Sequence, residues 1–388
     1  MTPAARISAA IEVLDAIRAG VSAEQALTNW ARRSRFAGSG DRAALRDHVF
    51  DVLRRWRSCA ALGGGETGRA LMLGALRAQG IDPDTLFTGV GHAPAPLTAA
   101  ERDGGAPPEG VAALDLPDWL WPRFQLALGA EAEDAAEAMR HRAPVMLRVN
   151  PRRGTPADAI GGLAVEGIVA EPCEIARNTL HVTGGERKIT ASSAYREGLI
   201  ELQDGSSQAA MERLDVTSGA RVLDYCAGGG GKTLALAARA EARWFAHDVA
   251  PERMKDLPAR AARARVAVRV MDHAALQAAA PFDLVLCDVP CSGSGTWRRT
   301  PEAKWRLTPE RLRELTRVQA QILTEASLLV APGGVLAYAT CSVLNEENQD
   351  VISCFERNNP GWNRLRQERW SISRHGDGFF LVQLCRVI

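Results

Sequence analysis

From about residue 200 to the carboxyl terminus, short apolar strands alternate with helical segments. The strand-like runs, such as RVLDYC and FDLVLCDVP, are rich in Val, Leu and Phe and end in Asp, Cys or Pro. The clearest helical segment, 308–331, has a Thr-Pro start and is followed by Pro-Gly. This alternation predicts a doubly wound α/β domain with a mostly parallel sheet.

The first of these strands leads into a glycine-rich turn, DYCAGGGGKT at 224–233. Such a turn lets a ligand approach the backbone closely where a helix begins. A phosphate-binding P-loop needs glycine at position 226, where Cys226 stands, and a dinucleotide fingerprint from Gly228 needs glycine or alanine where Thr233 stands. Asp224, four residues before the first glycine, instead fits the loop of S-adenosylmethionine-dependent enzymes. We expect its carboxylate to position loop amides and the amino-acid portion of that cofactor.

Two further aspartates close the next two strands. Asp248 is expected to accept hydrogen bonds from the cofactor ribose, and Asp272 is expected to flank the adenine. A solvated loop residue or a helix cap is the alternative for either one alone, but their shared position at successive strand ends favours the cofactor. The full set expected at the cofactor is Asp224, Cys226, Ala227, Gly228, Gly230, Gly231, Lys232, Asp248, Arg253, Asp272 and Asp288.

Two cysteines, Cys291 and Cys341, directly follow predicted strands. Ligands of open α/β sheets gather at the carboxyl ends of strands, so thiols at these positions can meet a substrate. Cys287, Cys354 and Cys385 are instead expected to be packing residues. The pair at the strand ends implies thiol chemistry on a pyrimidine ring.

The amino-terminal part of the chain has a different pattern. Residues 1 to about 90 show helical periodicity and predict a small helical bundle. Residues 91–118 are rich in Pro, Gly and Ala without a period, which is typical of a linker. A helical pair and then a short β-α-β element, from 144 to about 174, are expected to bridge to the catalytic domain.

The chain resembles the Sun-type (RsmB-like) RNA cytosine-5 methyltransferases in an ordered set of motifs: DYCAGGGGKT, AHDVAPERM, VMDHA, CDVPCSGSGTWRRTPEAKW and YATCSVLNEEN. The resemblance covers nearly the whole chain, since REGLIELQDGSSQAA matches an upstream family segment and GDRAALRDHVFDVLRRW is similar to a NusB-like RNA-binding bundle. The paired PCS and TCS motifs are highly specific. The chain departs from the family at Gly228 and Gly229, where alanine and proline are common, so the consequence for cofactor affinity stays open.

The resemblance implies a multidomain protein. An all-α, NusB-like RNA-binding domain with its linker would occupy 1–118, and a small α+β bridging region 119–205. An α/β Rossmann-like, S-adenosylmethionine-dependent methyltransferase domain would occupy 206–388.

The expected chemistry explains why both cysteines are needed. Carbon 5 of cytosine is too weak a nucleophile to take a methyl group unaided, and thiolate addition at carbon 6 activates it. The resemblance implies that Cys341 is the nucleophile and that Cys291 assists release. The reverse assignment stays open because DNA cytosine methyltransferases attack from a Pro-Cys motif like the one at Cys291. Asp288 is expected to hydrogen-bond the ring at N3, and Lys232 to pair with Asp288.

The implied substrate is a cytosine in structured RNA, by resemblance in small-subunit (16S) ribosomal RNA, with another RNA such as tRNA as the alternative. An unstacked base is cheapest to reach in a loop. Trp297 and Trp305 are candidates to stack on bases, with core packing as their alternative. Arginines and lysines expected to hold phosphates, each with a solvated helix face as the alternative, are Arg298, Arg299, Lys304, Arg306, Arg311 and Arg313, with a second surface at Arg32, Arg33, Arg54, Arg55 and Arg57.

Composition narrows the classes of function and the cellular compartments that fit the sequence. A net charge of +1 does not by itself indicate a nucleic-acid partner, and eight cysteines without framework spacing indicate reduced thiols in a cytoplasmic protein. The first helix carries Glu12 and Asp15 and is not expected to be a signal peptide, and no apolar stretch suggests a membrane segment. No metal is expected, because no CxxC pair exists. A dinucleotide oxidoreductase leaves the strand-end cysteines unexplained, and a non-catalytic NusB-like RNA-binding factor is the remaining alternative.

Overall fold

The computed structural model describes residues 1–387, and the chain divides into two compact units. The first unit comprises Met1–Arg142 together with Trp297–Arg306, and the second comprises Ala143–Thr296 and the chain from Leu307 onward. The short segment that follows the Cys291 loop therefore belongs to the amino-terminal unit. The predicted division at 118 and 205 stays a prediction.

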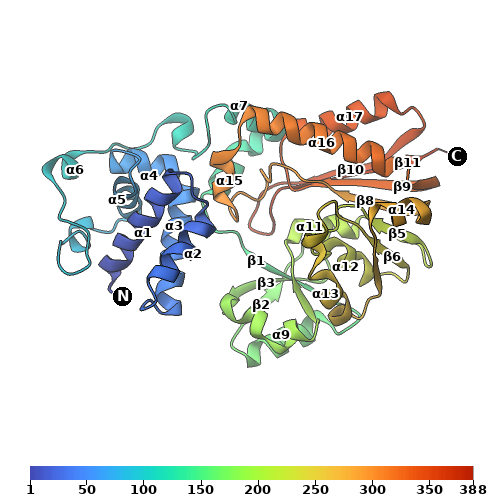
Figure 1. Ribbon diagram of the computed structural model, residues 1–388, viewed down its shortest axis with the longest axis horizontal. Helices are drawn as coiled ribbons and strands as arrows, with labels where there is room; N and C mark the ends of the chain where they lie inside the picture. The colour runs from blue at the N-terminus through green and yellow to red at the C-terminus, as the bar shows by residue number, and fades with distance from the viewer. Residues whose placement is uncertain (388) are drawn as a thin grey trace. The chain divides into compact units, whose positions relative to one another are not determined.

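The first unit is a helical bundle, as its periodicity predicts (Figure 1). Leu45, Val49, Val52 and Leu53 lie on one face of the third helix and are buried in the core of the bundle. Thr2, Ser22 and Thr67 cap three of the helices by accepting a hydrogen bond from a first-turn amide. The helices are α1 (Pro3–Arg18), α2 (Ala23–Arg33), α3 (Ser39–Arg54), α4 (Trp56–Gly63) and α5 (Gly68–Ala78).

The predicted linker is mostly irregular, and the helical pair follows it. Within 91–118 the structure forms only the short helix α6 (Ala99–Asp103) and the 3₁₀ turn η2 (Gly110–Ala112), while η1 (Pro83–Thr85) precedes it. The predicted pair is α7 (Trp121–Leu128) and α8 (Ala132–Met139), joined by η3 (Gly129–Glu131).

The segment 297–306, which ends in helix α15 (Pro301–Arg306), packs into this unit. The Trp297 ring stacks on Phe124 at 5.9 Å between centroids, and Trp305 Nε1 donates to the Leu53 carbonyl at 2.6 Å. Trp297, Arg298 and Lys304 are almost fully buried, with exposed fractions of 0%, 3% and 1%. Trp297 therefore follows the core-packing alternative, and the prediction that Arg298 and Lys304 contact RNA is wrong, because their side chains are buried.

The second unit contains a small antiparallel sheet that the sequence prediction captured only in part. The order is β2-β3-β1-β4, so the two strands of the predicted β-α-β element are not neighbours, and β3 lies between them. The predicted strand, helix and strand are present as β1, α9 and β2, but β3 and β4 were not predicted. The elements are β1 (Val145–Val149), α9 (Pro156–Val165), β2 (Val169–Pro172), β3 (Thr179–Gly184), η4 (Glu186–Ala191), α10 (Ser193–Arg196) and β4 (Ile200–Leu202).

The rest of the second unit is the doubly wound domain, built on a seven-stranded sheet of order β10-β11-β9-β8-β5-β6-β7. The five strands from β9 to β7 are parallel to one another, and β11 and β10 add antiparallel pairs at one edge. The strands are β5 (Arg221–Asp224), β6 (Arg243–Ala246), β7 (Val268–Val270), β8 (Phe282–Asp288), β9 (Val330–Thr340), β10 (Trp362–Trp370) and β11 (Phe379–Arg386).

Helices cover both faces of this sheet (Figure 1), because alternate strand residues point to opposite sides. Leu223 and Val285 share a core with side chains of α16 and α17, whereas Val222 and Leu284 share another with α11 and α12. The helices are α11 (Gly205–Glu212), α12 (Gly231–Ala237), α13 (Leu257–Ala264), α14 (His273–Ala279), α16 (Pro309–Ser327) and α17 (Gln349–Asn358), with 3₁₀ turns η5 (Pro251–Met254) and η6 (Asn345–Glu347).

The buried Lys304 makes the stability of the first unit depend on pH. Its Nζ donates to the Arg54 carbonyl at 3.2 Å, and burial lowers the pKa of Lys304 to about 7. The unfolded chain keeps this proton up to about pH 10.4, so it binds more protons than the folded chain in that window. The free energy of unfolding should therefore rise between pH 7 and pH 10 by up to about 1.4 kcal/mol per pH unit from this group.

Replacing Lys304 by methionine should remove this contribution and flatten the pH dependence. Urea unfolding followed by tryptophan fluorescence at pH 7.0, 8.0 and 9.0 measures it, with the exposed Lys255→Met as the matched control. Equal slopes in Lys304→Met and the wild type contradict the account.

Candidate active site

The predicted site residues gather at the carboxyl edge of the parallel strands. Asp224 and Asp288 are the last residues of β5 and β8, and Cys341 directly follows β9. Strands β8 and β9 run parallel with Asp288 opposite Ala339, so the loops that follow leave the sheet side by side. This edge is where open α/β sheets bind ligands.

The two strand-end cysteines are in contact. Cys291 Sγ and Cys341 Sγ lie 3.4 Å apart, and both side chains are half-buried. The hydrogen bond with Cys341, together with burial, raises the pKa of Cys291 well above its usual range. Cys291 therefore holds its proton and can donate it towards the Cys341 sulfur.

Lys232 and Asp288 form an ion pair beside the cysteines. Lys232 Nζ lies 2.5 Å from Asp288 Oδ2 and 5.2 Å from the centre of the Phe379 ring. Burial works to lower the pKa of Lys232, but the Asp288 carboxylate outweighs it and, with a Cys341 thiolate, raises that pKa. The lysine is therefore a fixed positive charge that stabilises negative charge at both partners.

The environment of Asp224 shows whether the glycine-rich loop suits S-adenosylmethionine. The side chain is buried, and its Oδ2 accepts a hydrogen bond from Thr233 Oγ1 at 2.6 Å. Its Oδ1 is buried and has no hydrogen-bond partner among residues 1–387, and burial raises the pKa of Asp224 to about 6. A buried carboxylate oxygen without a donor fits a ligand that carries an ammonium group, as the amino-acid portion of this cofactor does.

Asp248 organises the glycine loop from the next strand end. Its Oδ2 accepts from the Gly228 amide at 3.0 Å, its Oδ1 accepts from the Ala250 amide at 3.0 Å, and Arg253 Nη1 lies 3.2 Å away. Gly228 and Gly230 have φ angles of +48° and +76°, which glycine adopts without strain. The structure therefore brings two other predicted cofactor residues, Gly228 and Arg253, into contact with Asp248.

The remaining predicted cofactor residues are placed less closely. Asp272 is exposed and caps α14 by accepting from the Ala275 amide at 2.8 Å, which is the alternative weighed for it. The Ala227 amide donates to the His247 carbonyl at 2.8 Å, and burial raises the pKa of the Cys226 thiol. Contacts of Asp272, Ala227 and Cys226 with the cofactor stay predictions.

Sequence reasoning missed Glu347, a fully buried carboxylate that joins the two cysteine loops. Its Oε1 accepts from the Ser292 amide at 2.7 Å, and its Oε2 accepts from the hydroxyls of Ser292 and Ser342, each at 2.5 Å. Gln319 Nε2 donates to Oε1 at 3.0 Å and to the Pro290 carbonyl at 3.0 Å. Ser292 follows Cys291 and Ser342 follows Cys341, so one carboxylate fixes both thiol-bearing turns.

A further polar layer closes this network. Ser294 Oγ and Ser342 Oγ lie 2.8 Å apart, and Thr340 Oγ1 donates to Asn348 Oδ1 at 2.6 Å. Asn348 Nδ2 in turn donates to the Ser342 carbonyl at 2.9 Å. The sequence signal for this network consists of the serines of the PCS and TCS motifs and the glutamate and asparagine of the NEEN motif.

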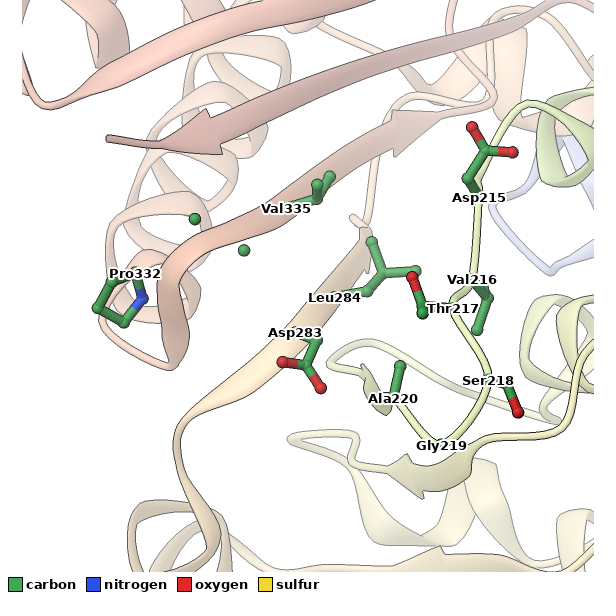
Figure 2. Close-up of a pocket in the computed structure, with 12 residues that line it drawn as sticks. Asp215, Val216, Thr217, Ser218, Gly219, Ala220, Asp283, Leu284, Pro332 and Val335 are labelled. Carbon is green, nitrogen blue, oxygen red and sulfur yellow. The ribbon is translucent and has the colours of Figure 1, made fainter. Parts of the chain in front are cut away.

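A cavity of about 480 Å³ lies at the opposite edge of the sheet (Figure 2). It is lined by the turn before β5 and by the first residues of β8 and β9, including Asp215, Asp283 and Val335. At about 3.3 Å per strand residue, roughly 16 Å of β8 separate Asp283 from Asp288. None of the predicted site residues lines this cavity.

Two kinds of feature are absent from residues 1–387. No helix within 1–387 has both the length and the apolar character needed to cross a membrane. The same residues contain no group of three or more His, Cys, Asp or Glu side chains able to hold a metal ion.

Comparisons with known proteins agree with the geometry. A family model described as 16S rRNA methyltransferase RsmB/F matches residues 211–382, and a second, the ferredoxin-like domain of RsmF/B-like methyltransferases, matches residues 116–187. The chain is 32% identical over 285 residues to the ribosomal RNA small subunit methyltransferase B of Serratia proteamaculans, and 31% identical over 284 residues to that of Yersinia pestis. The chain belongs to the RsmB/F methyltransferase family. Each alignment covers 70% of this chain and 66% of the relative.

Solved structures share the architecture of this RsmB/F family member. The crystal structure of PH0851 superposes with a TM-score of 0.78 at 25% identity and covers 99% of both chains. A methyltransferase homologue from Pyrococcus horikoshii gives a TM-score of 0.61 at 25% identity, covering 71% of this chain and 96% of that one.

In this RsmB/F chain, Glu347→Gln should loosen both cysteine loops. A glutamine has one acceptor oxygen, so it cannot accept hydrogen bonds at both ends of the side chain as the carboxylate does, and losing charge-assisted hydrogen bonds of this kind costs about 2 kcal/mol. Local opening would then bring amide exchange about 30-fold faster in peptides that cover 289–296 and 340–347. Hydrogen-exchange mass spectrometry measures this, with the exposed Asp350→Asn as the charge-matched control. Unchanged exchange in Glu347→Gln would show that the carboxylate does not hold the loops.

Proposed function

We propose that this protein transfers a methyl group from S-adenosylmethionine to carbon 5 of a cytosine in structured RNA, through a covalent cysteine–cytosine intermediate. The observation that carries the proposal is the 3.4 Å contact between the Cys291 and Cys341 sulfurs beside the Lys232–Asp288 ion pair. The names of the family model and of the relatives support small-subunit ribosomal RNA as the substrate class.

Cys341 is proposed as the nucleophile. Its sulfur adds to carbon 6, which makes a new S–C6 bond and leaves carbon 5 electron-rich. Two observations support this choice: the raised pKa of Cys291 favours a thiol at position 291, and the positive charge of Lys232 acts on the Cys341 sulfur. After methyl transfer, carbon 5 loses its proton to a base, the S–C6 bond breaks, and the electron pair returns to the cysteine sulfur. Cys291 is proposed to assist this release.

Asp288 is proposed to contact the pyrimidine ring at N3, on the side away from carbon 6. Addition at carbon 6 builds negative charge at ring N3, and Asp288 stabilises it when its carboxyl group carries a proton that it donates to N3. Lys232 keeps Asp288 in place through the ion pair of 2.5 Å. The same two residues therefore serve both the base and the orientation of the nearby thiolate.

The cofactor supplies a methyl group on a positively charged sulfonium, which is electrophilic enough for the activated carbon 5 to take. Asp224, with its unpartnered buried oxygen, is proposed to hold the amino-acid portion. Asp248 is proposed to hold the ribose, with Asp272 near the adenine. The other loop residues proposed to line this site are Cys226, Ala227, Gly228, Gly230, Gly231 and Arg253.

The substrate side of the proposal is RNA in the cytoplasm. Of the arginines after Cys291 that were predicted to hold phosphates, Arg299, Arg306, Arg311 and Arg313 are exposed, and these are proposed to contact phosphates. Arg311 and Arg313 now pair with Glu314 at 2.9 Å and with Glu310 at 2.7 Å, so binding would exchange those partners.

Substituting each cysteine separately tests the mechanism. Cys341→Ala should abolish methylation without any covalent adduct, because no S–C6 bond can form. Cys291→Ala should lower turnover about 10²–10⁴-fold and accumulate a protein–RNA adduct, because release is impaired. Denaturing gel electrophoresis of the reaction with labelled RNA detects the adduct, and methyl incorporation measures turnover.

Two outcomes change the proposal in different ways. Normal methylation by both variants contradicts the covalent mechanism. A swapped pattern, with the adduct in Cys341→Ala, exchanges the two roles.

A further inference from the structure

The glycine loop of the cofactor site is held from outside by arginine side chains. The Gly229 carbonyl accepts a hydrogen bond from Arg260 Nη1 at 2.5 Å, and the Gly231 carbonyl accepts one from Arg148 Nη1 at 2.8 Å. Arg260 lies on α13 and Arg148 on β1, so two separate elements bind the loop through its backbone carbonyls. Backbone carbonyls fixed in this way leave the loop less free to change conformation.

A buried carboxylate orients the first of these arginines. Glu201 on β4 has an exposed side-chain fraction of 5%, and its Oε2 lies 2.9 Å from Arg260 Nη2. Its Oε1 lies 2.6 Å from Arg263 Nη2, so the two carboxylate oxygens hold one arginine each. The guanidinium of Arg260 thus bridges Glu201 and the Gly229 carbonyl.

A side chain at position 229 and the Arg260 guanidinium compete for the same space. A Cβ atom on Gly229 would lie 2.8 Å from Arg260 Nη1, closer than unstrained contact allows. The φ angle of Gly229 is not in the left-handed range, so its backbone itself accepts other residues. The loop can therefore be stiffened either by a side chain at 229 or by the arginine, but not by both in their present positions.

We infer that Arg260, oriented by Glu201, is a positioning residue that fixes the Gly228–Gly229 segment for S-adenosylmethionine in place of a side chain at position 229. Two adjacent glycines give the free loop more conformations to lose on binding, and the hydrogen bond to the Gly229 carbonyl removes part of that freedom beforehand. The inference rests on the proposed function, because it assumes that this loop binds that cofactor.

Arg263 provides a matched control. It binds the same carboxylate and lies on the same helix, but its guanidinium packs over the Tyr195 ring at 4.6 Å. Replacing either arginine by methionine removes one positive charge from Glu201. Only Arg260→Met also removes the hydrogen bond to the loop.

Isothermal titration calorimetry of the full-length protein with S-adenosylmethionine and with S-adenosylhomocysteine tests the inference. Arg260→Met should raise Kd about tenfold, whereas Arg263→Met should change it by less than about threefold. In the absence of ligand, hydrogen exchange in the peptide 225–233 should be faster in Arg260→Met than in Arg263→Met. If Arg260→Met does not fold, Arg260→Lys takes its place and should give an intermediate Kd, since lysine keeps the charge without the planar fork.

A double substitution gives a further test, because the effect of Gly229→Ala on cofactor affinity should have opposite signs in the wild type and in Arg260→Met. A general loss of stability does not produce such a reversal. Gly229→Ala should weaken binding in the wild type, because it displaces the guanidinium, and should strengthen binding in Arg260→Met, because it restricts the free loop. Wild-type affinity in Arg260→Met, or a weakening by Gly229→Ala in both backgrounds, overturns the inference. Failure of the wild type to bind either ligand overturns the proposed function instead.

Discussion

The parallel pairing of β8 with β9 determines the geometry of the site. Asp288 lies opposite Ala339, so the loops that begin after these strands are neighbours from their first residue. Cys291 is three residues beyond one partner and Cys341 two beyond the other, and their sulfurs come to 3.4 Å. A shift of one residue in this register would turn a side chain to the other face of the sheet and separate the thiols.

Two buried carboxylates maintain this arrangement in different ways. Glu347 binds the turns that carry the cysteines, and it accepts hydrogen bonds on both oxygens. Glu201 acts on the cofactor side, where it reaches the glycine loop through Arg260. Buried charges are costly unless they are paired or well hydrogen-bonded. Glu201 is paired with Arg260 and Arg263, and Glu347 accepts four hydrogen bonds. The small antiparallel sheet thus contributes to the proposed cofactor site through β4.

The sequence predicts the doubly wound sheet, the contact of the strand-end cysteines and the Lys232–Asp288 pair, because each follows from strand order and strand ends. It does not predict the burial of Glu347, since apart from its place in the NEEN motif nothing local distinguishes this residue from the exposed or half-buried acidic residues beside it. Its burial depends on α16 and on both cysteine loops. The same applies to Arg298 and Lys304, whose charges suggest RNA contacts although both side chains are buried. Long-range packing decided these positions, and it leaves no local pattern.

The most direct test of the central claim maps the covalent bond itself. Wild-type protein is incubated with S-adenosylmethionine and substrate RNA that carries 5-fluorocytosine, whose fluorine cannot leave carbon 5 as the proton does. The account predicts a stable protein–RNA adduct, and tandem mass spectrometry of the digested adduct should place the methylated fluorocytosine on Cys341. The absence of an adduct, or attachment to a residue other than the two strand-end cysteines, would contradict it.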